Sequence, residues 1–140
     1  KFDYQDYYKR IYVENTPGEL PTESELKKYA GLCLDLNHFE SIRLEKRNNG
    51  QEFKTLAGLA ERYPIGVNHV GAINKKLTVF YDLLSGEKFY GYDSHCLNDL
   101  SQLNYVKKYK KYLADIISLE LENPLKRQLE IKKYLENIIF

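Results

Sequence analysis

Apolar residues recur at intervals of three and four along most of the chain, which is typical of amphipathic helices. These stripes predict helices over residues 3–14, 22–47, 53–60, 103–117 and 125–139. Thr22 and Glu25 have the spacing of a capping box at the start of the second helix. Gly31 falls inside the same helix, where it weakens the helix by about 1 kcal/mol relative to alanine.

The pattern changes in the second half of the chain. Residues 65–76 fit a helix better than the alternative, a strand interrupted by glycines. Two β-rich runs around a loop at residues 85–88 predict an antiparallel hairpin over residues 77–92. We therefore expect an α+β fold, a mostly helical single domain (1–140) with one short hairpin and two C-terminal helices.

Residues 52–92 carry a pattern that belongs to a known DNA-binding arrangement. Ala60 is a small residue where two helices would cross, and Val70, ten residues later, is a β-branched residue that would pack beneath the first helix. The turn departs from the usual pattern, because Pro64 stands where a glycine with positive φ is common. This segment, within a core of residues 22–92, resembles a winged helix-turn-helix domain. The resemblance implies that the 67–76 helix enters the major groove and that the hairpin is the wing.

The net charge excludes two classes of protein that act on or imitate nucleic acid. The 21 basic and 20 acidic residues leave a net charge of +1, which fits neither a basic coat for nucleic acid nor an acidic mimic of it. A local basic patch with interleaved tyrosines lies at residues 105–112, where lysines could follow a phosphate backbone. The alternative is a solvated helix face whose tyrosines belong to the core. The candidate nucleic-acid contacts are Asn68, His69, Asn74, Lys75, Lys76, Lys88, Lys107, Lys108 and Lys111.

Motifs for catalysis and metal binding are sparse. Cys33, His69 and Asp93 follow the chain order of papain-like thiol hydrolases, but Cys33 lies on an apolar stripe, which favours a buried, inert cysteine. His95 and Cys96, taken with the remaining histidines, lack the paired spacing of a zinc site. The sequence also contains no phosphate-binding glycine loop or nucleophile elbow. We therefore predict no catalytic residue, metal or cofactor.

These observations favour a small protein that works by binding. The leading hypothesis is a nucleic-acid-binding regulatory or accessory protein of a phage or mobile element, and the alternative is a protein–protein interaction module or protein inhibitor that uses its 13 tyrosines. The helical part at residues 97–140 is expected to form a homodimer or a docking surface. The two cysteines suit a reducing compartment, and no apolar run is long enough to span a membrane, so we expect a cytoplasmic protein.

Overall fold

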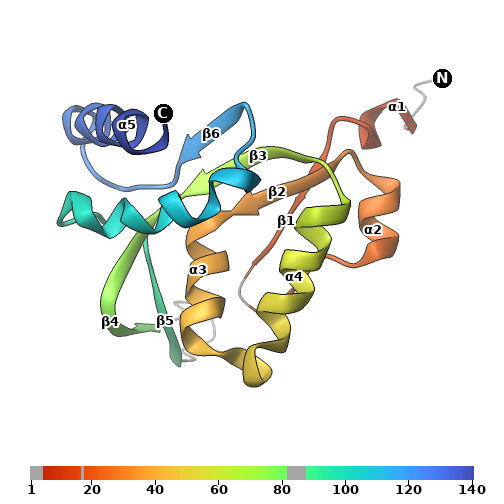
Figure 1. Cartoon of the computed structure of the whole chain (residues 1–140), viewed down its shortest axis with the longest axis horizontal. Coiled ribbons are helices and arrows are strands. Elements are labelled where there is room, and N and C mark those ends of the chain that lie inside the picture. Colours follow the sequence, from red (N-terminus) through yellow and green to blue (C-terminus); the bar gives the residue numbers. More distant parts are fainter. Residues whose placement is uncertain (1–4, 17, 82–87) are drawn as a thin grey trace.

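A parallel β-sheet forms the centre of the computed structural model, which describes residues 5–16, 18–81 and 88–140. The four strands lie in the order β1-β2-β3-β6 (Figure 1). Their bounds are β1 (Tyr12–Glu14), β2 (Gly31–Asp35), β3 (Ile65–Val70) and β6 (Ile116–Leu119). A separate antiparallel pair consists of β4 (Ala72–Tyr81) and β5 (Lys88–Ser94).

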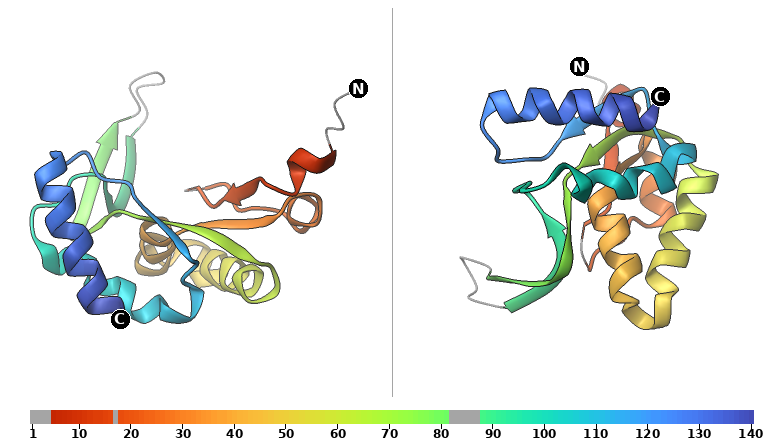
Figure 2. Two further views of the ribbon diagram at one scale, coloured as in Figure 1. Left: turned by 90° about the horizontal axis from the view of Figure 1, so that it is seen from above. Right: turned by 60° about the vertical axis from the view of Figure 1, so that its left-hand side comes forward.

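The described residues include five α-helices and two 3₁₀ helices. They are α1 (Gln5–Tyr8), α2 (Glu23–Lys28), α3 (Leu36–Glu45), α4 (Gln51–Arg62) and α5 (Leu125–Ile139), with 3₁₀ helices η1 (Arg47–Gly50) and η2 (Leu100–Tyr112). From above, α3, α4 and η2 lie on one side of the sheet and the β4–β5 hairpin projects to the other (Figure 2). The fully buried Leu34, Phe39 and Leu56 belong to the core between this sheet face and the helices. In the described part of the chain, no helix has the length and apolar character needed to cross a membrane.

The expectation of a mostly helical domain with a single hairpin is wrong. The chain folds as a mixed α/β protein with a four-stranded parallel sheet beside a two-stranded antiparallel one. Because both faces of a central parallel strand are covered, such a strand reads as a continuous apolar run rather than as an alternation. Periodicity alone does not distinguish that run from a segment of buried helix.

The predicted helix at residues 22–47 contains the clearest example. Its capping box at Thr22 is confirmed, but α2 ends at Lys28, and the apolar run from Gly31 to Asp35 is the buried strand β2. Gly31 has a φ of +147°, and a Cβ there would lie 2.2 Å from the carbonyl oxygen of Pro64. This glycine therefore permits the close approach of two chain segments and does not weaken a helix.

The segment at residues 65–76 is also extended. It forms β3 and the start of β4, so the recognition helix of a winged helix-turn-helix domain does not exist here. Gly66 allows β3 to pass close to the ring of Tyr12, since a Cβ at this position would lie 2.1 Å from that ring. The predicted hairpin is confirmed and begins earlier, at Ala72. The loop predicted at residues 85–87 lies outside the described residues.

The C-terminal third matches the expectation in part. The predicted helices at residues 53–60 and 125–139 are confirmed within α4 and α5. The predicted helix at residues 103–117 is wrong in its second half, because η2 ends at Tyr112 and Ile116 begins strand β6. Leu113 adopts an extended conformation at the end of η2, and the following residues pair in parallel with β3.

Candidate metal centre

Acidic and imidazole side chains gather where the parallel strands end. Residues two apart along a strand share one face of a sheet, and neighbouring strands lie about 4.8 Å apart. The register pairs Glu14 with Cys33 between β1 and β2, and pairs Asp35 with His69 between β2 and β3. Glu120 follows β6 directly, and its backbone N–H donates to the carbonyl oxygen of Val70. Consecutive strands thus bring chemically reactive side chains to the same edge of the sheet.

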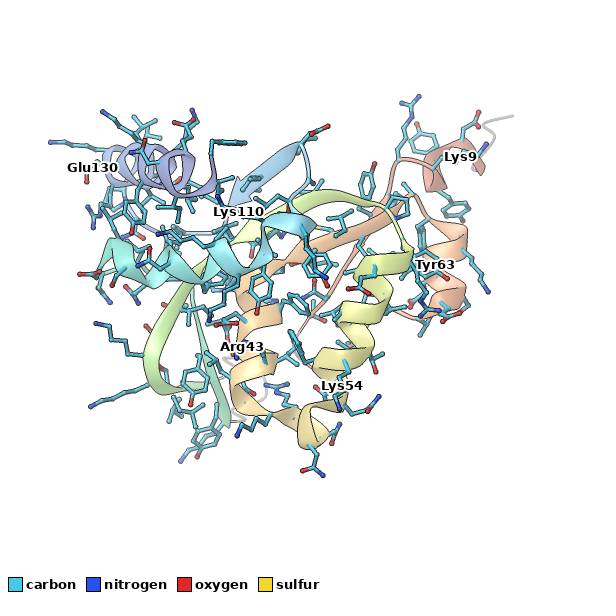
Figure 3. The ribbon with its side chains drawn as sticks, viewed as in Figure 1. Lys9, Arg43, Lys54, Tyr63, Lys110 and Glu130 are labelled. Carbon is cyan, nitrogen blue, oxygen red and sulfur yellow. The ribbon has the colours of Figure 1, made fainter. Side chains whose placement is uncertain are left out.

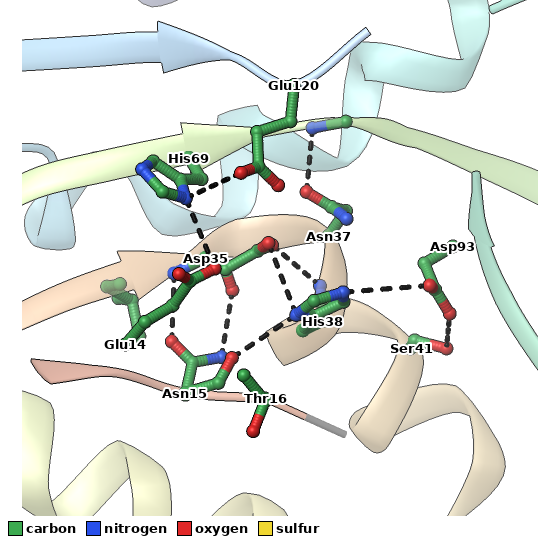
Figure 4. A network of polar contacts seen from close by, with 12 residues as sticks. Glu14, Asn15, Thr16, Asp35, Asn37, His38, Ser41, His69, Asp93 and Glu120 are labelled. Atoms are coloured by element: carbon green, nitrogen blue, oxygen red, sulfur yellow. Dashed lines mark hydrogen bonds and ion pairs between the residues drawn. The ribbon is translucent and has the colours of Figure 1, made fainter. Parts of the chain in front are cut away.

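Four of these side chains converge closely enough to hold one cation (Figure 4). Ligand atoms of Glu14, Asp35, His69 and Glu120 all lie within 4.8 Å of one another. The Nδ1 atom of His69 is 2.9 Å from a carboxylate oxygen of Glu120 and 3.2 Å from one of Glu14. The side chains of Glu14, His69 and Glu120 are 34%, 21% and 29% exposed, so the cluster is accessible from solvent.

Asp35 is the buried member of the cluster, with no exposed surface. Its Oδ1 atom caps helix α3 by accepting a hydrogen bond from the backbone N–H of His38 at 2.9 Å. Its Oδ2 atom is buried and accepts no hydrogen bond from the described residues. Nδ1 of His38 lies 3.2 Å from this oxygen, but the hydrogen bond of that nitrogen goes to the backbone carbonyl of Asn15. One carboxylate oxygen therefore lies inside the protein with an imidazole nitrogen at 3.2 Å but without a hydrogen bond from the described residues.

The electrostatics of the cluster favour an added positive charge. The pKa of Asp35 is raised to about 8, chiefly by burial; the hydrogen bond from the His38 N–H and the charge of His69 oppose the rise, and the carboxylates of Glu120 and Glu14 add to it. The contacts of Asp35 to the described residues include no lysine or arginine. A bound divalent cation would compensate this excess of negative charge and favour the ionised form.

A second polar network holds Asp35 from the other side. The amide of Asn15 donates to the backbone carbonyl of Asp35 and accepts from its backbone N–H, at 3.1 and 2.8 Å. Nε2 of His38 lies 3.7 Å from a carboxylate oxygen of Asp93, and the other oxygen of Asp93 lies 3.0 Å from the hydroxyl of Ser41 (Figure 4). These contacts connect β1, β2, α3 and β5, so the position of the Asp35 backbone is fixed from several elements.

Comparison of this chain with protein families, with curated proteins and with solved structures finds no match.

The predicted nucleic-acid contacts lie in three separate places. His69 belongs to the cluster described above, whereas Asn68 is fully buried and its amide bonds the carbonyls of Leu34 and Tyr112 and the N–H of Ala114. The other predicted contacts lie on the hairpin (Asn74, Lys75, Lys76 and Lys88) and on η2 (Lys107, Lys108 and Lys111). The helix predicted to present Asn68 and Asn74 on one face is absent. Binding of nucleic acid through the exposed residues of this set stays a prediction, and it would use the hairpin and η2 instead of a recognition helix.

The tyrosines of the lysine-rich segment on η2 belong to the core, as the alternative interpretation predicted. Tyr105, Tyr109 and Tyr112 are buried in the core. Lys108 bonds the buried Glu40 and Lys111 bonds Glu61, each at 2.7 Å. Lys107 and Lys110 lie on the exposed side of η2, where Figure 3 labels Lys110. The patch consequently offers fewer unpaired cations and stacking rings than the sequence suggests.

The structure brings Cys33 and His69 together, with ligand atoms within 4.8 Å of each other, but Asp93, the third residue of the predicted thiol-hydrolase set, lies elsewhere. The side chain of Asp93 contacts His38, and that of His69 contacts Glu14 and Glu120. Burial raises the pKa of Cys33 to about 12, with further increases from Glu14 and the neighbouring carboxylates, so its thiol stays protonated. Within the described chain, His38, His69, His95 and Cys96 do not share a cluster with metal-ligand spacing.

Sequence reasoning missed the three acids of the cluster. Glu14, Asp35 and Glu120 are far apart in the chain, but each one ends a short apolar segment. That arrangement is a signal only if the segments are parallel strands, because the carboxyl ends of parallel strands meet at one edge of the sheet. With residues 22–47 interpreted as a single helix, the signal was hidden.

Proposed function

We propose that the cluster of Glu14, Asp35, His69 and Glu120 binds a divalent metal ion. The observation that carries this proposal is that ligand atoms of three carboxylates and one imidazole lie within 4.8 Å of one another, and that one of these carboxylates, Asp35, has a buried oxygen with no hydrogen bond from the described residues. Buried polar atoms in native proteins are almost always satisfied by protein, water or an ion. A cation, or a water molecule bound to it, would satisfy the Asp35 oxygen and reduce the repulsion among the carboxylates.

The arrangement fits hydrolysis better than a purely structural metal site. Structural sites are closed, whereas catalytic sites retain an open position for water. Three of the four side chains are partly exposed, and the edge where they lie is where open α/β sheets usually bind ligands. A metal ion there would lower the pKa of its bound water and so supply a nucleophile near neutral pH. We therefore propose a metal-dependent hydrolase.

Nucleic acid is the substrate class that the surroundings favour. Strand β4 leaves the cluster directly after Gly71, and a groove between β4 and η2 is lined by Asn74, Lys75 and Lys108. A neighbouring groove adds Lys76. Lysine and asparagine side chains bind phosphate oxygens in nucleic-acid complexes. We propose that a phosphodiester strand lies along these grooves and contacts Lys75 and Lys76, since Lys108 is paired with the buried Glu40.

Isothermal titration calorimetry with Mn²⁺ and Zn²⁺ tests the metal site. We expect one ion per chain, and we expect Glu14→Gln and His69→Asn to abolish measurable binding because each removes a ligand. Glu130→Gln is a matched control, since Glu130 lies on the surface of α5 and pairs there with Arg127, away from the cluster. Absence of binding to the wild-type protein, or equal binding by wild type and Glu14→Gln, would refute the metal site.

Cleavage of labelled single-stranded and duplex oligonucleotides tests the hydrolase. We expect metal-dependent cleavage that stops on addition of EDTA and in the Glu14→Gln variant. The double variant Lys75→Ala, Lys76→Ala should bind the oligonucleotide more weakly, because two phosphate contacts are lost. The KM for cleavage should rise accordingly, while metal binding stays unchanged. A metal-loaded protein that cleaves neither oligonucleotides nor a small chromogenic phosphodiester would contradict the proposed activity.

A further inference from the structure

Cys33 shares the sheet face of the metal centre. It pairs in register with Glu14, and it precedes Asp35 by two residues, so its side chain lies on the same face as both. The ligand atoms of Cys33, Glu14 and His69 lie within 4.8 Å of one another. Two overlapping sets of ligands therefore exist, and Glu14 and His69 belong to both.

The surroundings of Cys33 are unusual for a cysteine with a purely structural role. The residue is 6% exposed, yet its neighbours on this face are Glu14 and His69, both partly exposed and polar. A core cysteine is ordinarily enclosed by apolar side chains and behaves as a small hydrophobic residue. Here the thiol has an imidazole and a carboxylate within the distance that a single metal ion spans.

We infer that Cys33 is a ligand of the metal centre and that the centre selects zinc over magnesium, calcium and manganese. This inference rests on the proposed metal site. Glu14, Cys33 and His69 would supply the three protein ligands of a catalytic zinc ion, with water in the fourth position. In this refinement of the proposed site, Asp35 and Glu120 would contact the metal-bound water instead of the ion. On binding, a Zn–S bond forms, the thiol proton passes to solvent, and no atom changes its oxidation state.

The choice of metal follows from the chemistry of the donors. Carboxylates alone suit magnesium, calcium and manganese, whereas a thiolate selects softer ions such as zinc. A coordinating thiol loses its proton on binding, so zinc affinity should fall as the pH is lowered. The buried position of Cys33 also protects the thiol from oxidation while the ligand set is empty.

Cobalt(II) as a spectroscopic probe tests this inference directly. A thiolate bound to cobalt gives an intense sulfur-to-metal charge-transfer band in the near ultraviolet, and oxygen and nitrogen ligands do not. We expect this band in the wild-type protein and in Cys96→Ser, whose cysteine is exposed and free. We expect Cys33→Ser to bind cobalt without the band, and its zinc affinity to fall roughly 100-fold, the upper end of the cost of losing an outer-shell partner.

The outcomes separate the inference from the proposal beneath it. If calorimetry shows that wild-type protein binds cobalt but the spectrum lacks the band, the metal site stands and Cys33 is not a ligand. A band that persists in Cys33→Ser would have the same meaning. If wild-type protein binds no cobalt, the metal site itself is refuted, and this inference with it. Circular dichroism of Cys33→Ser checks its fold, and the spectra of wild type and Cys96→Ser decide the question even if that variant does not fold.

Discussion

Replacement of Asp35 by asparagine should stabilise the metal-free protein, and more so as the pH rises. The Asp35 carboxyl has a pKa of about 8 in the folded protein, raised chiefly by burial, against a usual value of 3.8. A group whose pKa is raised by folding favours the folded state at low pH, and this advantage is lost as the pH rises through the folded pKa. At about 1.4 kcal/mol for each pKa unit, ionised Asp35 costs up to about 6 kcal/mol well above pH 8.

The asparagine side chain keeps the shape and the helix cap but carries no charge. Its oxygen can accept from the His38 N–H as Asp35 does, and its amide can donate to the surrounding carboxylates. We expect the difference in free energy of unfolding between Asp35→Asn and wild type to grow by about 3 kcal/mol between pH 5 and pH 7.5. The other titrating groups are common to both proteins and largely cancel in this difference.

Urea denaturation followed by tyrosine fluorescence, in EDTA and at several pH values, measures this difference. Saturating zinc should reverse the order of stability, because the wild type gains binding free energy and the variant loses much of it. Parallel pH profiles of the two proteins in EDTA would refute the reasoning, since they would show that Asp35 does not titrate between the folded and unfolded states in this range.

Further substitutions test the fold around the site. Gly31→Ala should destabilise the protein by about 3 kcal/mol or more in urea denaturation, because the new Cβ would lie 2.2 Å from the carbonyl oxygen of Pro64. Gly58→Ala is the matched control and should stabilise α4 by about 0.5 to 1 kcal/mol, since nothing lies within 4 Å of its Cβ position; equal effects would contradict both assignments. Tyr109→Phe should cost about 1.5 to 3 kcal/mol, because its hydroxyl donates to the buried Glu40 carboxylate at 2.5 Å, and a neutral result would exclude that bond.

Several local signals predicted local structure well, but the helix predicted at residues 3–14 is wrong beyond the short α1, because Tyr12 begins strand β1. The capping box at Thr22, the hairpin and the helix ending at Ile139 depend on residues close in sequence, and all three are confirmed. The parallel sheet depends on pairings between distant segments, such as Cys33 with Val67. No turn chemistry signals such a pairing, because parallel strands are joined by long crossovers rather than by tight turns.

The candidate site was hidden for the same reason. His69 was singled out from its type and position alone, but for a different role, as a contact to bases. Its partners, Glu14 and Glu120, lie at the carboxyl ends of β1 and β6, the two outermost strands of the sheet. A cluster assembled from four segments has no spacing signature, so only the order and direction of the strands could reveal it.

The pKa values of two buried acids, Glu40 and Asp35, are shifted in opposite directions. Burial raises the pKa of Glu40, but hydrogen bonds from Arg43, Lys108 and Tyr109 outweigh this effect and lower the pKa below its usual value. The protein itself therefore neutralises one buried carboxylate. Asp35 is equally inaccessible, but its neighbours include two further carboxylates, and its pKa rises.

A fold selected for stability alone would gain by replacing Asp35, since buried charges without a partner are among the costliest features of a protein interior. Buried ionisable groups with shifted pKa values are common at functional sites, where they bind ligands or take part in catalysis. Arg43, Lys108 and Tyr109 stabilise the negative charge of Glu40. For Asp35, we propose that a bound cation provides this stabilisation. The proposed divalent cation, bound at the solvent-accessible ends of the strands by a set that includes His69 and Glu14, would provide it.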